Sequence, residues 1–171
     1  MRNRMMMAGA LALLGCGPST GPVTMVGASI FTSDVQVLVA EDYGGGFAPA
    51  PPPGSTCVMG AAKYTLTVGT KTVDWTRCLV KGTDPYKPVS GSKVLTDAEY
   101  KNLSLYLENL TVAAPGSACG ADKSILEVTI TTPSGKQVYG DSFYSCTIKD
   151  KPLLKTETIS SLFQQLYNLT M

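Results

Sequence analysis

The 171-residue chain contains no histidine, and this single absence excludes much of the known enzyme chemistry. Serine–histidine–aspartate and cysteine–histidine sites both need an imidazole as the general base. Zinc sites with histidine ligands are excluded for the same reason. Carboxylates are then the only plausible groups for acid–base catalysis, and the sequence predicts a protein that is not an enzyme.

The chain also lacks any cluster of basic residues, and its formal net charge is only +1. Nucleic-acid binding therefore has no electrostatic basis. A glycine-rich phosphate loop is missing too, because the glycines at 44–46 follow an expected strand but do not open a helix. We expect neither a nucleic-acid partner nor a cofactor.

Only one hydrophobic run stands out, and it lies at the N-terminus. Arg2 and Arg4 precede an uncharged apolar stretch over residues 5–14. This order is typical of a secretory signal. The stretch is too short to span a bilayer, which needs about 20 residues.

The segment Leu13-Leu14-Gly15-Cys16 resembles the lipobox of bacterial lipoproteins. The resemblance implies cleavage before Cys16 and attachment of palmitate-type chains, which together hold a protein stably on a membrane. Gly17 rather than aspartate follows, which by resemblance to lipoprotein sorting in Gram-negative bacteria favours the outer membrane. We expect a signal peptide over 1–15, a tether over 16–30 and one domain over 31–171. The alternative is an ordinary secreted protein without lipid.

With Cys16 set aside, four of the five cysteines remain, in a domain that we expect to be exported. Disulfides form and persist in such compartments. Sequence alone cannot choose among the possible pairings. We favour Cys57–Cys78 and Cys119–Cys146, because each pair brackets an expected hairpin. A four-cysteine metal site is the alternative, but no CxxC spacing supports it, and we expect no metal.

Alternation of apolar and polar residues predicts a sheet built from hairpins. A first strand is expected at 35–39, a weaker one at 23–31, one hairpin at 63–68 and 73–80, and a second at 125–131 and 137–148. Trp75 is expected to pack in the core. The stretches 48–54 and 82–93, rich in proline, glycine and serine, are expected to be loops.

Two helices are predicted, one after each hairpin. Thr96 and Glu99 form a capping box at the start of the first, with Leu95 and Tyr100 as its hydrophobic staple. The second covers 156–169 and carries an apolar stripe. Together these elements predict an α+β fold: an antiparallel sheet built from hairpins, two helices packed on one face, and two disulfides.

Three carboxylates on or near the hairpins are the candidates for catalysis, namely Asp74, Asp122 and Asp141. A close pair of carboxylates can act as acid and base, as in glycosidases. Residues of this kind are more often solvated turn positions, so we expect no catalytic site.

The order of elements resembles the emfourin family, small bacterial inhibitors of thermolysin-type metalloproteases. The residues that carry the resemblance are Gly45-Gly46-Phe47-Ala48 after the first strand, Leu95-Thr96-Asp97-Ala98-Glu99 at the first helix and Leu126-Glu127-Val128-Thr129 in the second hairpin. The resemblance spans most of 35–169 and implies a candidate binding loop at Gly45, Gly46 and Phe47. Pro49 departs from the family, which usually has glycine there. A fainter similarity, through Phe143 and Cys146, is to subtilisin-inhibitor-like proteins.

These observations predict a membrane-anchored envelope lipoprotein with a non-enzymatic, protein-binding domain. The expected partners are the membrane, through the N-terminal lipid, and another protein, with a protease as the specific candidate. The alternative is a structural or assembly lipoprotein of the cell envelope with no discrete active site.

Overall fold

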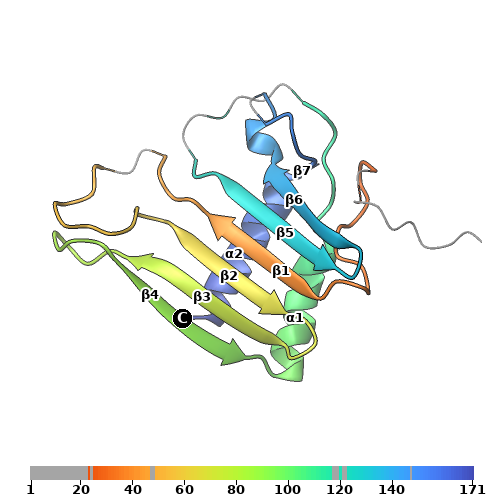
Figure 1. Ribbon diagram of the computed structural model, residues 1–171, viewed down its shortest axis with the longest axis horizontal. Coiled ribbons are helices and arrows are strands. Elements are labelled where there is room, and N and C mark those ends of the chain that lie inside the picture. Colours follow the sequence, from red (N-terminus) through yellow and green to blue (C-terminus); the bar gives the residue numbers. More distant parts are fainter. Residues whose placement is uncertain (1–22, 24, 47–48, 117–119, 121–122, 147) are drawn as a thin grey trace, which may run out of the picture.

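The computed structural model describes residues 23, 25–46, 49–116, 120, 123–146 and 148–171. Within these residues, seven strands form one sheet and two α-helices cover one of its faces (Figure 1). In chain order the elements are β1 (Val37–Asp42), β2 (Ala62–Thr67), β3 (Thr72–Leu79), β4 (Lys87–Val94), α1 (Asp97–Glu108), β5 (Leu126–Thr132), β6 (Gly135–Asp141), the short 3-10 helix η1 (Ser142–Tyr144), β7 (Leu153–Leu154) and α2 (Thr156–Leu169). None of the described helices is long and apolar enough to cross a membrane.

The central strand of the sheet is β1, in the strand order β4-β3-β2-β1-β5-β6-β7. It pairs antiparallel with β2 on one side and with β5 on the other. Leu38 therefore lies between Leu66 and Ile130, and all three side chains are buried beneath the helices. β-branched and other apolar residues at every second position place one face of the sheet in the core.

The expected α+β class and the two helices on one face are confirmed, but the expectation of a purely antiparallel sheet is wrong. β6 and β7 pair parallel, with Gly140 opposite Leu153 and Asp141 opposite Leu154. After β6 the chain passes through η1 and a connection over 145–152, and so returns to the sheet in the same direction. The sheet is therefore mixed, because this connection is long enough to bring the chain back to the start of the neighbouring strand.

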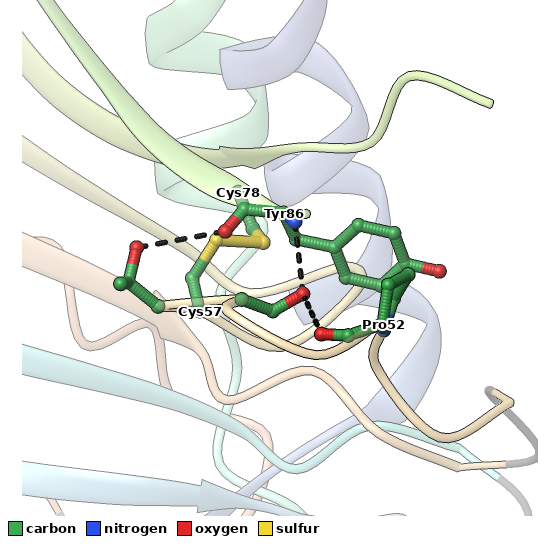
Figure 2. Close-up of a disulfide and its surroundings, with 6 residues drawn as sticks. Pro52, Cys57, Cys78 and Tyr86 are labelled. Atoms are coloured by element: carbon green, nitrogen blue, oxygen red, sulfur yellow. Dashed lines mark hydrogen bonds between the residues drawn. A yellow bond between two sulfur atoms is a disulfide. The ribbon is translucent and has the colours of Figure 1, made fainter. Parts of the chain in front are cut away.

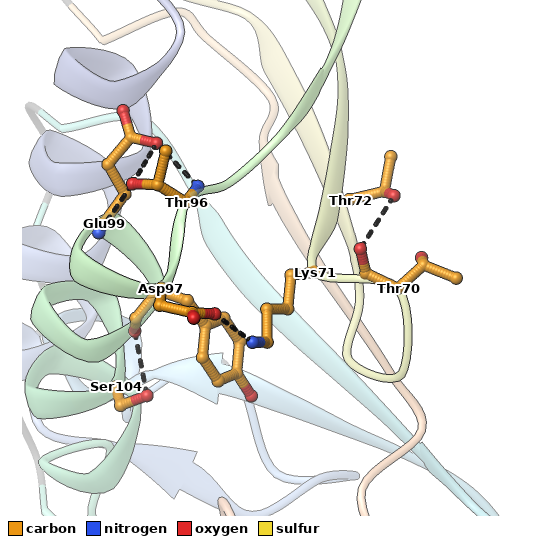
Figure 3. Close-up of polar contacts among 8 residues, drawn as sticks. Thr70, Lys71, Thr72, Thr96, Asp97, Glu99 and Ser104 are labelled. Atoms are coloured by element: carbon orange, nitrogen blue, oxygen red, sulfur yellow. Dashed lines mark hydrogen bonds and ion pairs between the residues drawn. The ribbon is translucent and has the colours of Figure 1, made fainter.

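Helix α1 begins at the capping box that the sequence predicts. The Thr96 hydroxyl accepts from the Glu99 amide at 3.2 Å, and the Glu99 carboxylate accepts from the Thr96 amide at 2.9 Å (Figure 3). Leu95 before the cap is buried, and Tyr100 packs against the core. Leu103 and Leu107 form the buried face of the helix.

Helix α2 covers the range that the sequence predicts. Its apolar stripe is buried against the sheet, where the Phe163 ring meets the Tyr64 ring edge-on with the centroids 6.2 Å apart. The two helices also contact each other, so the core is closed between them and the sheet. Local periodicity was sufficient to place both helices because each has one continuous apolar face.

The expectation of a loop over 82–93 holds for residues 82–86 and is wrong for 87–93, because β4 occupies Lys87–Val94 as an edge strand. Its residues are poor strand formers, but they pair with the whole of β3. Trp75 lies opposite Gly91, and a side chain at Gly91 would meet the indole at 2.2 Å. Trp75 packs against the core, as expected, and its ring covers the glycine of the neighbouring strand.

Strand boundaries also differ from the expectation. β1 covers Val37–Asp42 instead of 35–39, and β6 stops at Asp141. In the described part of the weaker strand expected at 23–31, the structure has an isolated bridge between Ser29 and Thr111 in place of a strand. Next to this bridge, the amide of buried Ile30 donates to the Leu110 carbonyl at 2.9 Å. Segment 27–30 thus pairs with residues beyond α1 instead of adding a full strand.

One disulfide joins described residues, Cys57–Cys78, as expected from the bracketing of the first hairpin. Of the two disulfides that the sequence predicts, one therefore lies wholly within the described residues. The second expected pair, Cys119–Cys146, includes Cys119, which lies outside the described residues. Its pairing remains a prediction.

Candidate functional site

The long connections of the sheet gather at one end of its strands, which we call the loop-bearing end. The β1–β2 connection over 43–61 and the β3–β4 connection over 80–86 both lie there (Figure 1). The opposite end carries the short β2–β3 and β5–β6 turns. Binding residues are concentrated on loops held by a rigid scaffold, so we expect a binding site at the loop-bearing end.

Two segments of this end are fastened together, and we call residues 49–61 and 80–87 the stapled double loop. The Cys57–Cys78 disulfide joins the first segment to the end of β3 (Figure 2). The Thr56 amide donates to the Tyr86 carbonyl at 2.9 Å, and the Tyr86 amide donates to the Ser55 hydroxyl at 2.9 Å. The Ser55 hydroxyl in turn donates to the Pro52 carbonyl at 2.7 Å. A covalent bond and a hydrogen-bonded chain thus hold the proline-rich segment in place.

Tyr86 is the packing anchor of the stapled double loop. It is 4% exposed although its neighbours in the 80–87 segment are exposed or only partly covered. Close by, a Cβ built on Gly54 would lie 3.8 Å from the Pro85 Cγ, which is van der Waals contact. The loop therefore has a small apolar centre of its own, which a freely moving insertion would lack.

The expected binding loop Gly45–Phe47 falls, in sequence, between the end of β1 and the first segment of the stapled double loop. Gly44, Gly45 and Gly46 all have positive φ, at 67°, 95° and 72°. A Cβ on Gly44 would lie 2.6 Å from the Met59 carbonyl oxygen, and the Gly45 amide donates to the same oxygen at 3.3 Å. The glycines thus let the two ends of the 43–61 connection approach each other. Phe47 lies outside the described residues.

A groove of about 540 Å³ runs beside Gly45, between α2 and the strand ends. One wall is the face of α2 that carries Ser160, Phe163, Gln164 and Tyr167, at the spacing of one helical face. The other wall comprises the end of β1, the start of β2, Arg77 and Cys78 of β3, and Lys123, Ser124 and Leu126 at the start of β5. Gly45 lies at its rim, so the groove adjoins the expected binding loop.

Arg77 is the positively charged group of the groove that the fold holds most firmly. Its guanidinium lies over the Tyr167 ring at 5.0 Å and beside the Trp75 ring at 6.0 Å, and it donates to the Thr170 carbonyl at 2.9 Å. The four ion pairs of the described residues lie elsewhere. Arg77 is thus oriented by rings and a carbonyl, while no carboxylate in the described part of the chain neutralises it.

Two further groups complete the charge pattern of the groove. Lys123 places its ammonium 4.7 Å from the centre of the Phe143 ring and forms no ion pair with the residues described. Asp42 is the acid in the lining, and burial raises its pKa above 3.8, although hydrogen bonds from Gly44 and Ser124 act in the opposite direction. Its carboxylate is engaged by these local donors, with the Gly44 amide at 2.8 Å. The groove therefore carries more positive than negative charge.

Tyr64 forms part of the floor of the groove. Burial raises the pKa of its hydroxyl above 10.0, while hydrogen bonds with Arg77 and Thr170 lower it in part. The hydroxyl therefore stays protonated near neutral pH and offers a polar atom beside the Arg77 guanidinium. Phe163 and Leu126 supply apolar surface on the two sides.

Of the three candidate carboxylates, the two in the described part of the chain, Asp74 and Asp141, do not form a pair. Asp74 is exposed on the uncovered face of β3, whereas Asp141 is buried, where it accepts from the Phe143 amide at 2.9 Å and from the Thr156 hydroxyl at 2.6 Å. Three strands separate β3 from β6, so the two lie roughly 20 Å apart across the sheet. Asp122 lies outside the described residues. No group of three or more potential metal ligands occurs in the described ranges.

The sequence reasoning missed Arg77, Tyr86 and the groove. Arg77 alternates with apolar residues on the inner side of β3, and this unusual position for a charged residue was the available signal. Tyr86 had no such signal, because its burial depends on a loop that is distant in sequence.

Comparisons of the chain with protein-family models, with curated proteins and with solved structures found no match.

Proposed function

We propose that this chain is a membrane-anchored envelope lipoprotein whose α+β domain binds another protein at its loop-bearing end. The partner to test first is a metalloprotease of thermolysin type, because of the resemblance to emfourins. The stapled double loop is the observation that carries the proposal. It is an exposed segment that a disulfide and backbone hydrogen bonds hold in one arrangement.

A rigid loop favours binding for an energetic reason. Ordering a mobile interface costs about 0.5–1.5 kcal/mol for each long side chain that is immobilised. In the stapled double loop, the segment from Pro52 to Cys57 is already held to Tyr86 and Cys78 before any partner arrives. More of the contact energy therefore remains for affinity.

The exposed side chains of this end suit a protein partner. Tyr43, Val58 and Leu79 are exposed by 50%, 42% and 51%. All three lie in or beside the stapled double loop, in the part of the chain that also carries Gly45 and Gly46. The centre of a protein interface is typically rich in aromatic and apolar residues and poor in charged ones.

The membrane anchor is the second part of the proposal, and it depends on Cys16. This residue lies outside the described residues. The test is intact-mass spectrometry of the mature protein from a Gram-negative host, with fractionation of the membranes. A diacyl- or triacylglyceryl mass on Cys16 in the outer-membrane fraction supports the anchor, and an unmodified N-terminus contradicts it.

The binding test compares two exposed valines at opposite ends of the strands. Val58 lies in the stapled double loop, whereas Val94 ends β4 at the other end and is 70% exposed. The lipidated protein in detergent is assayed for inhibition of thermolysin-type proteases and for binding to an identified envelope partner. We expect Val58→Asp to weaken binding about tenfold or more and Val94→Asp to leave it unchanged.

Two results contradict the proposal. One is an absence of both inhibition and partner for the wild-type protein. The other is an equal loss of binding in the two valine variants, which would place the contact away from the loops.

One feature favours the alternative, a structural or assembly role in the envelope with no discrete active site. β4 is a sheet edge, and an edge strand presents unpaired backbone groups to which another strand can add. If this role is correct, Val94→Asp disturbs assembly and Val58→Asp does not. Loss of envelope integrity on deletion of the gene would support it, and an unchanged envelope would contradict it.

A further inference from the structure

The groove beside α2 combines three properties that the protein-binding proposal does not use. It is enclosed on two sides, it has an oriented guanidinium at Arg77, and its walls include Phe163 and the Tyr64 ring. A volume of about 540 Å³ lies within the range typical of small-ligand sites, roughly 300–1,000 Å³. These properties together define the chemistry of a ligand.

The charge of the ligand follows from Arg77. A guanidinium presents five N–H donors in a planar fork, which matches a carboxylate with two parallel hydrogen bonds. In the described chain, Arg77 donates to the Thr170 carbonyl, but it has no anionic partner. The Tyr167 and Trp75 rings lie against the guanidinium, so little side-chain freedom is lost when an anion binds.

The chemistry of the uncharged part of the ligand follows from the residues that line the groove. Phe163, Leu126 and the Tyr64 ring offer apolar contact, while Gln164 and Ser160 on α2 offer neutral hydrogen-bonding groups. Lys123 adds a second positive charge on the other wall. A phosphate, which carries more charge and no apolar body, would leave these apolar walls without contact.

We propose that the groove is a binding site for an organic carboxylate with an aromatic or aliphatic body, in which Arg77 holds the carboxylate and the α2 wall holds the body. The site does not depend on the proposed protein-binding role. The carboxylate belongs either to a free organic acid or to the C-terminus of a polypeptide, and the experiment below separates these two sources.

The sole tryptophan of the chain, Trp75, provides the readout, because it lies beside Arg77. The purified full-length mature protein is titrated with 3-phenylpropanoate while tryptophan fluorescence is recorded. The matched neutral probe is 3-phenylpropanamide, which has the same body without the charge. We expect a saturable signal with the acid and affinity for the amide at least about tenfold lower, as loss of a charge-assisted hydrogen bond requires.

Variants test the role of Arg77. Arg77→Gln is expected to lower the affinity for the acid about tenfold or more, and Arg77→Lys to give an intermediate loss, because lysine keeps the charge without the fork. Lys123→Gln, at another position on the wall that faces α2, is expected to have a smaller effect. If Arg77→Gln fails to fold, two measurements still test the site. They are the affinities of the wild-type protein for the acid and the amide, and the affinity of the Lys123→Gln variant for the acid.

The second arm uses a tetrapeptide that ends in phenylalanine, with a free or an amidated C-terminus. Tighter binding of the free-ended peptide than of 3-phenylpropanoate identifies a polypeptide C-terminus as the natural source. Equal or weaker binding identifies a free organic acid. Failure of all the acids to give a saturable signal, or equal affinity for acid and amide, overturns the proposal.

Discussion

The two ends of the strands are built in different ways. At the loop-bearing end, long connections are held by the Cys57–Cys78 disulfide and by the buried Tyr86 side chain. At the turn end, short connections are held by local contacts, such as the hydrogen bond from the Lys71 amide to the Val68 carbonyl in the β2–β3 turn and the Thr96–Glu99 capping box at the start of α1 (Figure 3). The difference shows that a long connection needs partners distant in sequence to become ordered, whereas a tight turn needs only its neighbours.

The largest predicted effect is at Tyr86. Replacing this buried ring in Tyr86→Ala should lower the free energy of unfolding by about 3–4 kcal/mol, because a cavity forms between the two segments of the stapled double loop. Chemical denaturation measures the loss. Tyr86→Phe keeps the ring and is the control, with an expected loss below about 1 kcal/mol. An equally small loss in Tyr86→Ala would mean that the loop is ordered without its aromatic centre.

Removal of the disulfide comes next. The paired change Cys57→Ser with Cys78→Ser opens a link between residues 21 positions apart and should cost about 3 kcal/mol. Limited proteolysis should then cut within residues 49–61 before any cut at the β2–β3 turn, because the loop loses its covalent attachment. Thermal unfolding with and without reductant provides the matching measurement on the wild-type protein. Equal cleavage at both ends of the strands would contradict the claim that the disulfide orders the loop-bearing end in particular.

Substitution of Gly44 or Gly45, just after β1, should lower the free energy of unfolding by a smaller amount. Gly44→Ala places a Cβ 2.6 Å from the Met59 carbonyl oxygen, whereas Gly45→Ala meets nothing within 4 Å. Both residues have positive φ, so both variants suffer backbone strain of about 1 kcal/mol. Gly44→Ala should cost about 1–3 kcal/mol more because of the clash. Equal losses in denaturation would mean that the two ends of the connection are not held close together.

The smallest effect is expected at the turn end and depends on pH. Hydrogen bonds from Lys93 and Thr96 lower the pKa of Glu99 from 4.5 to about 2. A carboxyl whose pKa is lower in the folded state stabilises the fold above its unfolded pKa, and the effect is lost as the pH falls from 4.5 through about 2. The wild-type protein should therefore lose stability in this window, and Glu99→Gln should lose less. Parallel slopes of unfolding free energy against pH would contradict the assignment.

The candidate site was predictable only in part. The pairing of Cys57 with Cys78 could be predicted because the two cysteines bracket one hairpin. The segment from Gly44 to Gly46 was recognisable as a special turn because only glycine readily adopts three successive positive φ angles. Arg77 and Tyr167, by contrast, are brought together from β3 and the end of α2 by the fold alone. No local pattern in the sequence relates them.

Sequence by itself determined the two helices, the hairpins and the α+β class. Each of these depends on contacts between near neighbours, such as the Thr96–Glu99 cap and the alternation in β2, β3 and β5. Tertiary structure alone decided that Lys87–Val94 is a strand, that β7 runs parallel to β6, and that a positively charged groove lies beside α2. The physical reason is distance along the chain. Pairing with β3, the return of the chain after η1 and the contact of Arg77 with two rings all need partners that only the complete fold brings together.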